Sequence, residues 1–280
     1  MAQKSRPHEL GFPYNQRELM LGWRTLYFTA GEFKDNPQKS KEWNRGAYLV
    51  EGLGHCNACH AQRNMLGAIK SDDDYSGGLI PVQNWYAPSL TSNRESGLGG
   101  WELHDIVDLL RTGVSSRGAV FGPMAEVVQH SLQDLSKVDL QAMAVYLKEQ
   151  SEAASTAALP RNVPPAPSAT LSTGARIYKQ HCESCHMPEG SGVPRVYPRL
   201  ANNHAITMEN PVNSIRIVLN GGFPPSTEGN QRPYGMPPFY QELSDEQIAA
   251  VVTYIRQSWG NNAPATAPID VARSRGVPVD

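Results

Sequence analysis

The 280-residue sequence predicts a mostly α-helical protein built from two tandem domains that are joined by a Pro/Ala-rich linker. Three observations support this prediction. A Cys-x-x-Cys-His pentapeptide occurs twice, at residues 56–60 and 182–186. An apolar pattern with helical spacing follows Leu-Ser at 135–136 and recurs after Leu-Ser at 243–244. Between these halves, residues 151–169 are rich in Ala, Ser and Pro, a composition that favours extended chain over a packed core.

The chain is expected to run, in order, through a connector (1–35), a first domain (36–150), the linker (151–169), a second domain (170–262) and a C-terminal tail (263–280). The connector carries apolar residues on one face of a predicted amphipathic helix. These are Leu19, Met20, Trp23, Leu26 and Tyr27. We expect this helix to pack on the first domain; the alternative is docking to a partner subunit or to a membrane surface.

The two domains begin and end alike, which indicates duplication of one helical module. Each begins with a short helix that carries a glycine, Gly46 in the first domain and Gly174 in the second. Each ends with an amphipathic helix, and the two closing helices match at an offset of 108 residues. The closing helices are predicted to start with capping boxes. The pairs are Ser136 with Asp139 and Ser244 with Gln247.

The repeated pentapeptide is the attachment signature of c-type haem. Two residues between the cysteines let the thiols bond the two vinyl groups of the porphyrin, and the adjacent histidine reaches the iron. The predicted residues are Cys56, Cys59, His60, Cys182, Cys185 and His186. The chain has four cysteines, and the two motifs use all of them. The sequence therefore predicts two covalently bound haem c groups.

Other uses of the cysteines explain less of the pattern. One structural zinc ion would need both cysteine pairs, which are far apart in the sequence, and would leave the two histidines unexplained. A thioredoxin-like redox pair is typical of a βαβ context, which the sequence lacks. Two disulfides would also leave both histidines without a role.

Each haem iron needs a second axial ligand, or it stays open for chemistry. In the first half, Met65 is too close to His60, and Met143 belongs to the apolar stripe of the closing helix. Met124 lies in a loop-like stretch just before that helix and is the predicted ligand.

The second half gives the same answer at the matching place. Met187 adjoins the proximal His186, and Met208 falls in a helix-like region. Met236 lies in a Gly- and Pro-rich loop just before the closing helix and is the predicted ligand. The alternative for either methionine is gap filling in a core. Equivalent positions in the two halves favour the ligand prediction.

The order of opening helix, Cys-x-x-Cys-His, Pro-x-Leu, late methionine and closing helix resembles a class I cytochrome c domain. The resemblance implies that the opening and closing helices cross, with the glycine allowing their close approach. It also implies that the carbonyl groups of Pro88 and Pro198 accept the Nδ1 protons of His60 and His186. Each proline would thereby orient the histidine ring under its iron.

Longer stretches resemble the cytochrome c subunit of bacterial membrane-bound alcohol, gluconate and aldehyde dehydrogenase complexes. They include residues 42–56, 86–91, 101–113, 122–128 and 243–261. Members of that family usually carry three haem domains. The present chain has two haem motifs and resembles the second and third domains, and residues 1–35 resemble the connector before them. Arg63 matches a position of that family. Its side chain is expected either to bond a haem propionate or a backbone carbonyl, or to be exposed to solvent.

The resemblance implies a dihaem electron carrier of the respiratory chain with no catalytic residues of its own. Its partner would be a dehydrogenase catalytic subunit that uses pyrroloquinoline quinone, flavin or molybdenum. Electrons would pass on to quinone, another cytochrome or an oxidase. The alternative function is a dihaem peroxidase with one open iron, which the two well-placed methionines disfavour.

Composition is consistent with this function. The net charge of −2 does not indicate nucleic-acid binding, and no run of eighteen apolar residues predicts a membrane span. Haem c is attached outside the bacterial cytoplasm, so we expect a periplasmic protein, with peripheral association at the outer face of the inner membrane as an open alternative. The first residues lack the apolar core of a signal peptide.

Overall fold

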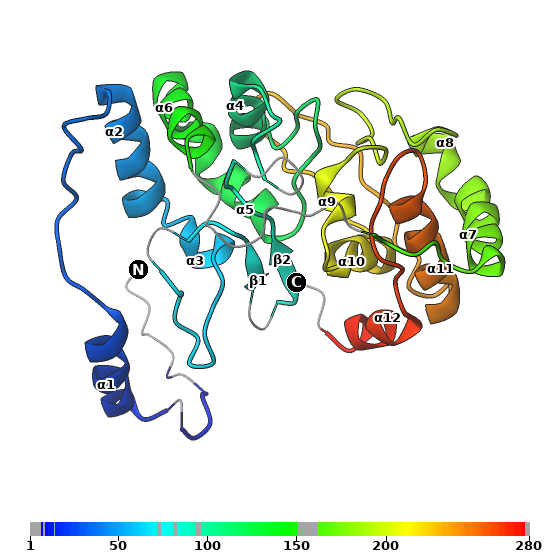
Figure 1. Ribbon diagram of the computed structural model, residues 1–280, viewed down its shortest axis with the longest axis horizontal. Coiled ribbons are helices and arrows are strands. Elements are labelled where there is room, and N and C mark those ends of the chain that lie inside the picture. Colours follow the sequence, from blue (N-terminus) through cyan, green and yellow to red (C-terminus); the bar gives the residue numbers. More distant parts are fainter. Residues whose placement is uncertain are drawn as a thin grey trace. The chain divides into compact units, whose positions relative to one another are not determined.

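The computed structural model describes residues 7, 9–13, 15–71, 74–80, 83–92, 97–150 and 162–277. It divides into two compact units, residues 1–35 and 36–280. Helices make up most of the regular structure in the described residues, together with a two-stranded sheet (Figure 1). The predicted mostly α-helical fold class is confirmed.

The first unit contains the predicted amphipathic helix, α1 (Arg17–Tyr27), which buries none of its residues. The rings of Trp23 and Tyr27 lie 5.4 Å apart on this helix, and the Arg24 guanidinium lies 4.8 Å from the centre of the Phe28 ring. The packing of α1 on another part of the protein stays a prediction.

The second unit begins with the elements of the first half. They are α2 (Lys41–Ala47), the π-helical turn η1 (Tyr48–Leu53), α3 (Asn57–His60), β1 (Gly78–Ile80), β2 (Trp85–Ala87), α4 (Leu103–Thr112), α5 (Pro123–His130), the 3₁₀ turn η2 (Leu132–Asp134) and α6 (Lys137–Lys148). Strands β1 and β2 pair antiparallel, with Leu79 opposite Tyr86.

In the second half of this unit, the regular elements of the described residues are all helices, joined by loops that carry isolated β-bridges. The helices are α7 (Ser168–His181), α8 (Glu183–His186), α9 (His204–Thr207), α10 (Val212–Asn220), α11 (Asp245–Gln257) and α12 (Pro268–Arg275). Helix α7 already begins inside the range predicted as linker, of which residues 151–161 lie outside the described residues. The range predicted as a tail contains α12, and Val271 of this helix is fully buried in the core of the second half.

The opening and closing helices of each half pack against each other at the predicted glycines: α2 on α6, and α7 on α11. A Cβ atom on Gly46 would lie 2.0 Å from the carbonyl oxygen of Ala142, and one on Gly174 would lie 2.3 Å from that of Ala250. These distances are shorter than any tolerated contact. The backbones therefore touch, and only glycine fits at either crossing.

The starts of the two closing helices differ from the symmetric prediction. At α11, Ser244 and Gln247 form the complete capping box. At α6, the Ser136 hydroxyl accepts from the Asp139 backbone N–H, but the Asp139 carboxylate accepts from Arg45 Nε at 2.7 Å. The hydrogen bond from Arg45 lowers the pKa of Asp139. The side chain that would close this capping box joins α6 to α2 instead.

Each half encloses its own apolar core. In the second half, Ile177, Ile215, Leu219, Ile248 and Val271 of four helices belong to one buried cluster. In the first half, the helix faces that pack together bury residues that include Val50, Ile106, Leu140, Met143 and Tyr146. Met143 is 1% exposed, as expected for a core residue.

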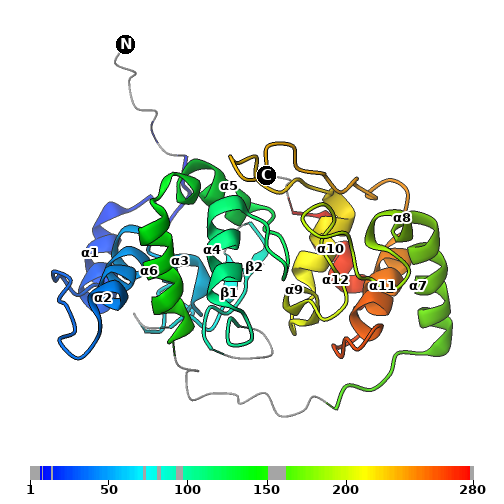
Figure 2. The ribbon, with the colours of Figure 1, turned by 90° about the horizontal axis from the view of Figure 1, so that it is seen from above.

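The two halves also contact each other, with α10 of the second half beside β2 of the first (Figure 2). In the described part of the chain, no helix has the length and apolar content of a bilayer-spanning segment.

Replacing Gly174 by Ala should destabilise the second unit, because the new methyl group overlaps the Ala250 carbonyl and forces α7 away from α11. Overpacking of this kind typically costs about 1–3 kcal/mol, and a clash with backbone belongs at the upper end. Urea unfolding of the two proteins measures the difference. Gly22→Ala in α1 is the control, because a Cβ there meets nothing within 4 Å. Equal unfolding free energies for Gly174→Ala and wild type would contradict the close crossing.

Candidate haem sites

The two pentapeptides adopt the same local structure, one helical turn that follows η1 in the first half and α7 in the second. In the first, α3, the His60 N–H donates to the Cys56 carbonyl at 2.9 Å. In the second, α8, the His186 N–H donates to the Cys182 carbonyl, also at 2.9 Å. Each histidine is thus tied through its backbone to the first cysteine of its own motif.

Both histidine rings are oriented by a proline carbonyl from a distant loop. His60 Nδ1 lies 2.6 Å from the Pro88 oxygen, and His186 Nδ1 lies 2.9 Å from the Pro198 oxygen. A carbonyl only accepts, so Nδ1 carries the proton and Nε2 keeps its lone pair for a metal. Burial lowers the pKa of both histidines, and the proline carbonyls oppose this effect. The neutral ring, the form that binds iron, is therefore favoured.

The four cysteines form no disulfide. Burial raises the pKa of the Cys56 thiol to about 11 and that of the Cys182 thiol to about 12. A redox-active Cys-x-x-Cys pair depends on a lowered thiol pKa, so these surroundings oppose the thioredoxin-like alternative. Helices α3 and α8 lie in different halves in both views (Figures 1 and 2), which does not gather the four thiols around one ion.

Met124, predicted in a loop-like stretch, instead lies in the first turn of helix α5, where the backbone is tightly constrained. Gly122 precedes the helix with a φ of 56°, and Pro123 occupies its first turn. The Met124 side chain is partly buried. Among the other first-half methionines, Met65 is fully exposed and Met143 is buried in the core.

Met236 lies in a loop that two backbone hydrogen bonds fix to the end of α10. Its N–H donates to the Gly222 carbonyl at 2.8 Å, and the Gly222 N–H donates to the Met236 carbonyl at 3.0 Å. Met236 is partly buried and packs against the core of the second half. Met208 is itself buried, and Met187 directly follows His186 with a φ of 64°. The ligand roles of Met124 and Met236 stay predictions.

Arg63 bonds backbone carbonyl groups on both sides of its position. Its guanidinium donates to the Gly67 carbonyl at 2.5 Å and to the Ala58 carbonyl inside the first pentapeptide. The sequence left three possible partners open for Arg63, and the structure shows that it bonds backbone carbonyl groups. Arg63 fastens the loop after the first motif to the motif itself.

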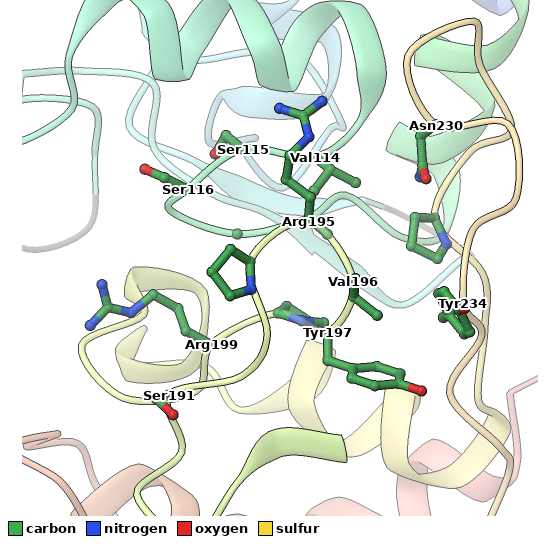
Figure 3. A pocket seen from close by; sticks show the side chains of 15 residues that line it. Val114, Ser115, Ser116, Ser191, Arg195, Val196, Tyr197, Arg199, Asn230 and Tyr234 are labelled. Atoms are coloured by element: carbon green, nitrogen blue, oxygen red, sulfur yellow. The ribbon is translucent and has the colours of Figure 1, made fainter.

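A cavity of about 300 Å³ between the halves is a feature that sequence reasoning missed. Residues of the segments 114–119 and 191–199 line it, with Pro224, Asn230 and Tyr234 (Figure 3). The rings of Tyr197 and Tyr234 lie 5.4 Å apart on one wall. Arg195 reaches the first half, where it pairs with Asp108 at 3.5 Å. Tyr197 adjoins Pro198, and Tyr234 is two residues from Met236. Their closeness in sequence to predicted site residues was the signal that could have indicated the cavity.

Comparisons with known proteins agree with these sites. The sequence profile of the cytochrome c family matches residues 171–259. Cytochrome c-552 of Thermus thermophilus is 35% identical over 91 residues, which cover 31% of this chain and 69% of that protein.

Longer matches cover nearly the whole chain. The cytochrome c subunit of alcohol dehydrogenase (quinone) from Gluconobacter oxydans (strain 621H) is 36% identical over 301 residues, covering 100% of this chain and 61% of that subunit. The gluconate 2-dehydrogenase cytochrome c subunit of Pantoea cypripedii is 36% identical over 289 residues, covering 98% of this chain and 66% of that subunit.

Two oriented histidines, each on a Cys-x-x-Cys-His turn inside a crossed-helix module, are what a cytochrome c requires. Together with the matches, they show that the chain belongs to the cytochrome c family, whose members hold haem c covalently. More particularly, it is similar to the cytochrome c subunits of alcohol and gluconate dehydrogenases, and it spans about three fifths to two thirds of their length.

Arg63→Ala should loosen the loop after the first motif, because it removes two hydrogen bonds from a charged donor. Such bonds contribute roughly 1.5 kcal/mol each. We expect amide exchange at Asn64 and Gly67, both now bonded inside the loop, to accelerate about tenfold or more. Lys70→Ala is the control, because the Lys70 ammonium donates to the Gln62 side chain in the same loop, while the backbone bond from Lys70 to Gln62 is kept. Unchanged exchange in Arg63→Ala would rule out the fastening role.

Proposed function

We propose that this chain is a dihaem cytochrome c that accepts electrons from a dehydrogenase and relays them onward through two His/Met haems. The observation that carries the proposal is the repeated site: in each half, a Cys-x-x-Cys-His turn presents a histidine whose Nδ1 is bonded to a proline carbonyl. The two sites belong to the domains predicted at 36–150 and 170–262.

The residues of this chain fit covalent haem c. The thiols are not engaged in disulfides, the histidines direct a free Nε2 away from the proline, and a partly buried methionine is available in each half. The aromatic wall of Tyr197 and Tyr234 next to Pro198 suits the edge of a flat macrocycle. A bound haem supplies a one-electron couple, whose potential His/Met ligation raises.

Each residue has a defined role in this proposal. The cysteines anchor the porphyrin, the prolines orient the histidines, and the histidine and methionine are the axial ligands. In the first half these residues are Cys56, Cys59, His60, Pro88 and Met124. In the second half they are Cys182, Cys185, His186, Pro198 and Met236. The chain moves no proton with a side chain of its own, so none of its residues is assigned a catalytic role.

The dehydrogenase partner is a catalytic subunit with pyrroloquinoline quinone, flavin or molybdenum as its cofactor. Downstream, a quinone, another cytochrome or an oxidase accepts the electrons. The similarity to cytochrome c subunits that are named for alcohol and gluconate dehydrogenases supports this role. The same names favour an electron carrier over a dihaem peroxidase. The proposed location is the periplasm, with peripheral association at the outer face of the inner membrane.

Substitution of the methionines tests the proposal. The oxidised protein should show the weak far-red sulfur-to-iron band with the intensity of two haems. Met124→Ala and Met236→Ala should each remove half of it, because each leaves one iron without its sulfur ligand. Met65→Ala, at a fully exposed methionine, is the control and should leave the band unchanged. A one-haem band with a high-spin signal in the wild type would instead indicate an open iron and peroxidase-type chemistry.

A further inference from the structure

One side chain of the second half forms two hydrogen bonds with the backbone of the first half next to a haem site. Asn213 of α10 uses both atoms of its amide on a single residue. Its Oδ1 accepts from the Tyr86 N–H at 2.8 Å, and its Nδ2 donates to the Tyr86 carbonyl at 2.7 Å. This is the pairing that a neighbouring strand would provide, and it fixes the position of β2 from the outer side.

Arg216, three residues further along α10, holds the preceding residue of the same strand. Its guanidinium carbon lies 4.9 Å from the centre of the Trp85 ring, within the range of a cation–π contact. Arg216 is 1% exposed. Residues three apart lie on one face of a helix. One face of α10 therefore holds two consecutive residues of β2, which places a buried positive charge beside the first half.

Tyr86 is linked through the chain to Pro88, which contacts the predicted iron ligand His60 of the first haem site. Two residues after it, the Pro88 carbonyl accepts from His60 Nδ1 at 2.6 Å. The residue between them, Ala87, is buried and pairs with Gly78 of β1. The short segment is thus held by β1 on one side and by Asn213 on the other. Any displacement of Tyr86 moves the carbonyl that orients His60.

Trp85 is linked by packing to the segment that carries the other predicted iron ligand of the same site, Met124. A Cβ atom on Gly122 would lie 2.6 Å from Cε2 of the Trp85 ring, so the ring is in direct contact with the backbone there. Gly122 has a φ of 56° and immediately precedes Pro123 and Met124. The place of the Trp85 ring therefore decides where α5 begins, and with it the position of the methionine sulfur.

We propose that α10 of the second half positions both axial ligands of the first haem. Asn213 acts on His60 through Tyr86 and Pro88, and Arg216 acts on Met124 through Trp85 and Gly122. Both are positioning residues that act through the residues they hold, Tyr86 and Trp85. The inference rests on the proposed function, because it assumes a haem at Cys56–His60. It also makes the potential of the first haem depend on the second half of the chain.

The test uses the full, haem-loaded chain with Asn213→Ala and Arg216→Gln. Thr227→Val is the matched control, because the buried Thr227 hydroxyl also bonds across the halves, to the Thr112 carbonyl at 3.2 Å, but away from β2. Three quantities are measured: the midpoint potential of each haem, its far-red band and the amide exchange of Tyr86. Loss of the band in Met124→Ala identifies the first haem.

In Asn213→Ala, we expect Tyr86 to exchange at least tenfold faster and the first haem to change its potential, because the carbonyl that orients His60 is no longer held in place. In Arg216→Gln, the first haem should lose far-red band intensity, because Trp85 no longer holds Gly122 and Met124 in place. Its potential should also fall, because a buried cation no longer disfavours the ferric state. Arg216→Lys, which keeps the charge, should restore part of this shift. The second haem and Thr227→Val should stay as in the wild type.

Faster Tyr86 exchange with an unchanged first haem would overturn the inference, as would equal shifts at both haems or a shift in Thr227→Val. If Arg216→Gln does not fold, Asn213→Ala decides, because Asn213 is only partly buried. Mass spectrometry of the wild type separates the two proposals. A chain without two covalent haems refutes the proposed function, whereas two His/Met haems with unresponsive variants refute only the positioning by α10.

Discussion

In both halves of this cytochrome c, a glycine of the opening helix lies against a backbone carbonyl of the closing helix, at Gly46 with Ala142 and at Gly174 with Ala250. The attachment turn comes after the opening helix, with α8 directly behind α7 and α3 behind the intervening η1, so the crossing restricts where both turns begin. Met124, at the start of α5, and Met236, in a loop, both precede the closing helices in the chain. Apolar burial around the crossing then stabilises an arrangement that backbone contact has already fixed.

The duplicated modules differ in the elements that accompany the crossed helices. In the second half, α7 runs unbroken for 14 residues and α12 adds a buried Val271 to the core. In the first half, α2 gives way to a π-helical turn, and a short hairpin stands beside the haem site. That hairpin has α10 of the other module as a neighbour.

At the start of α6, the structure departs from the predicted capping box because two partners compete for one carboxylate. The Ser244 box closes because Gln247 reaches back to its own helix start. The matching Asp139 is taken by Arg45, 94 residues earlier in the chain, because an ion pair outcompetes a backbone amide for a carboxylate. Helix α12 escaped prediction because it buries few residues in an eight-residue helix, too short for a clear apolar period.

The sequence by itself determined the attachment motifs, the two methionine candidates and the mostly helical fold, because these depend on spacings within a few residues and on a repeat visible in one dimension. The crossed helices were implied by the resemblance to class I cytochrome c. Only the tertiary structure decided that Arg63 bonds backbone, that a cavity lies between the halves, and that Asn213 and Arg216 hold Tyr86 and Trp85. Asn213 and Tyr86 are 127 residues apart. No local pattern encodes such a pair, since it exists only once the two halves of the chain have packed together.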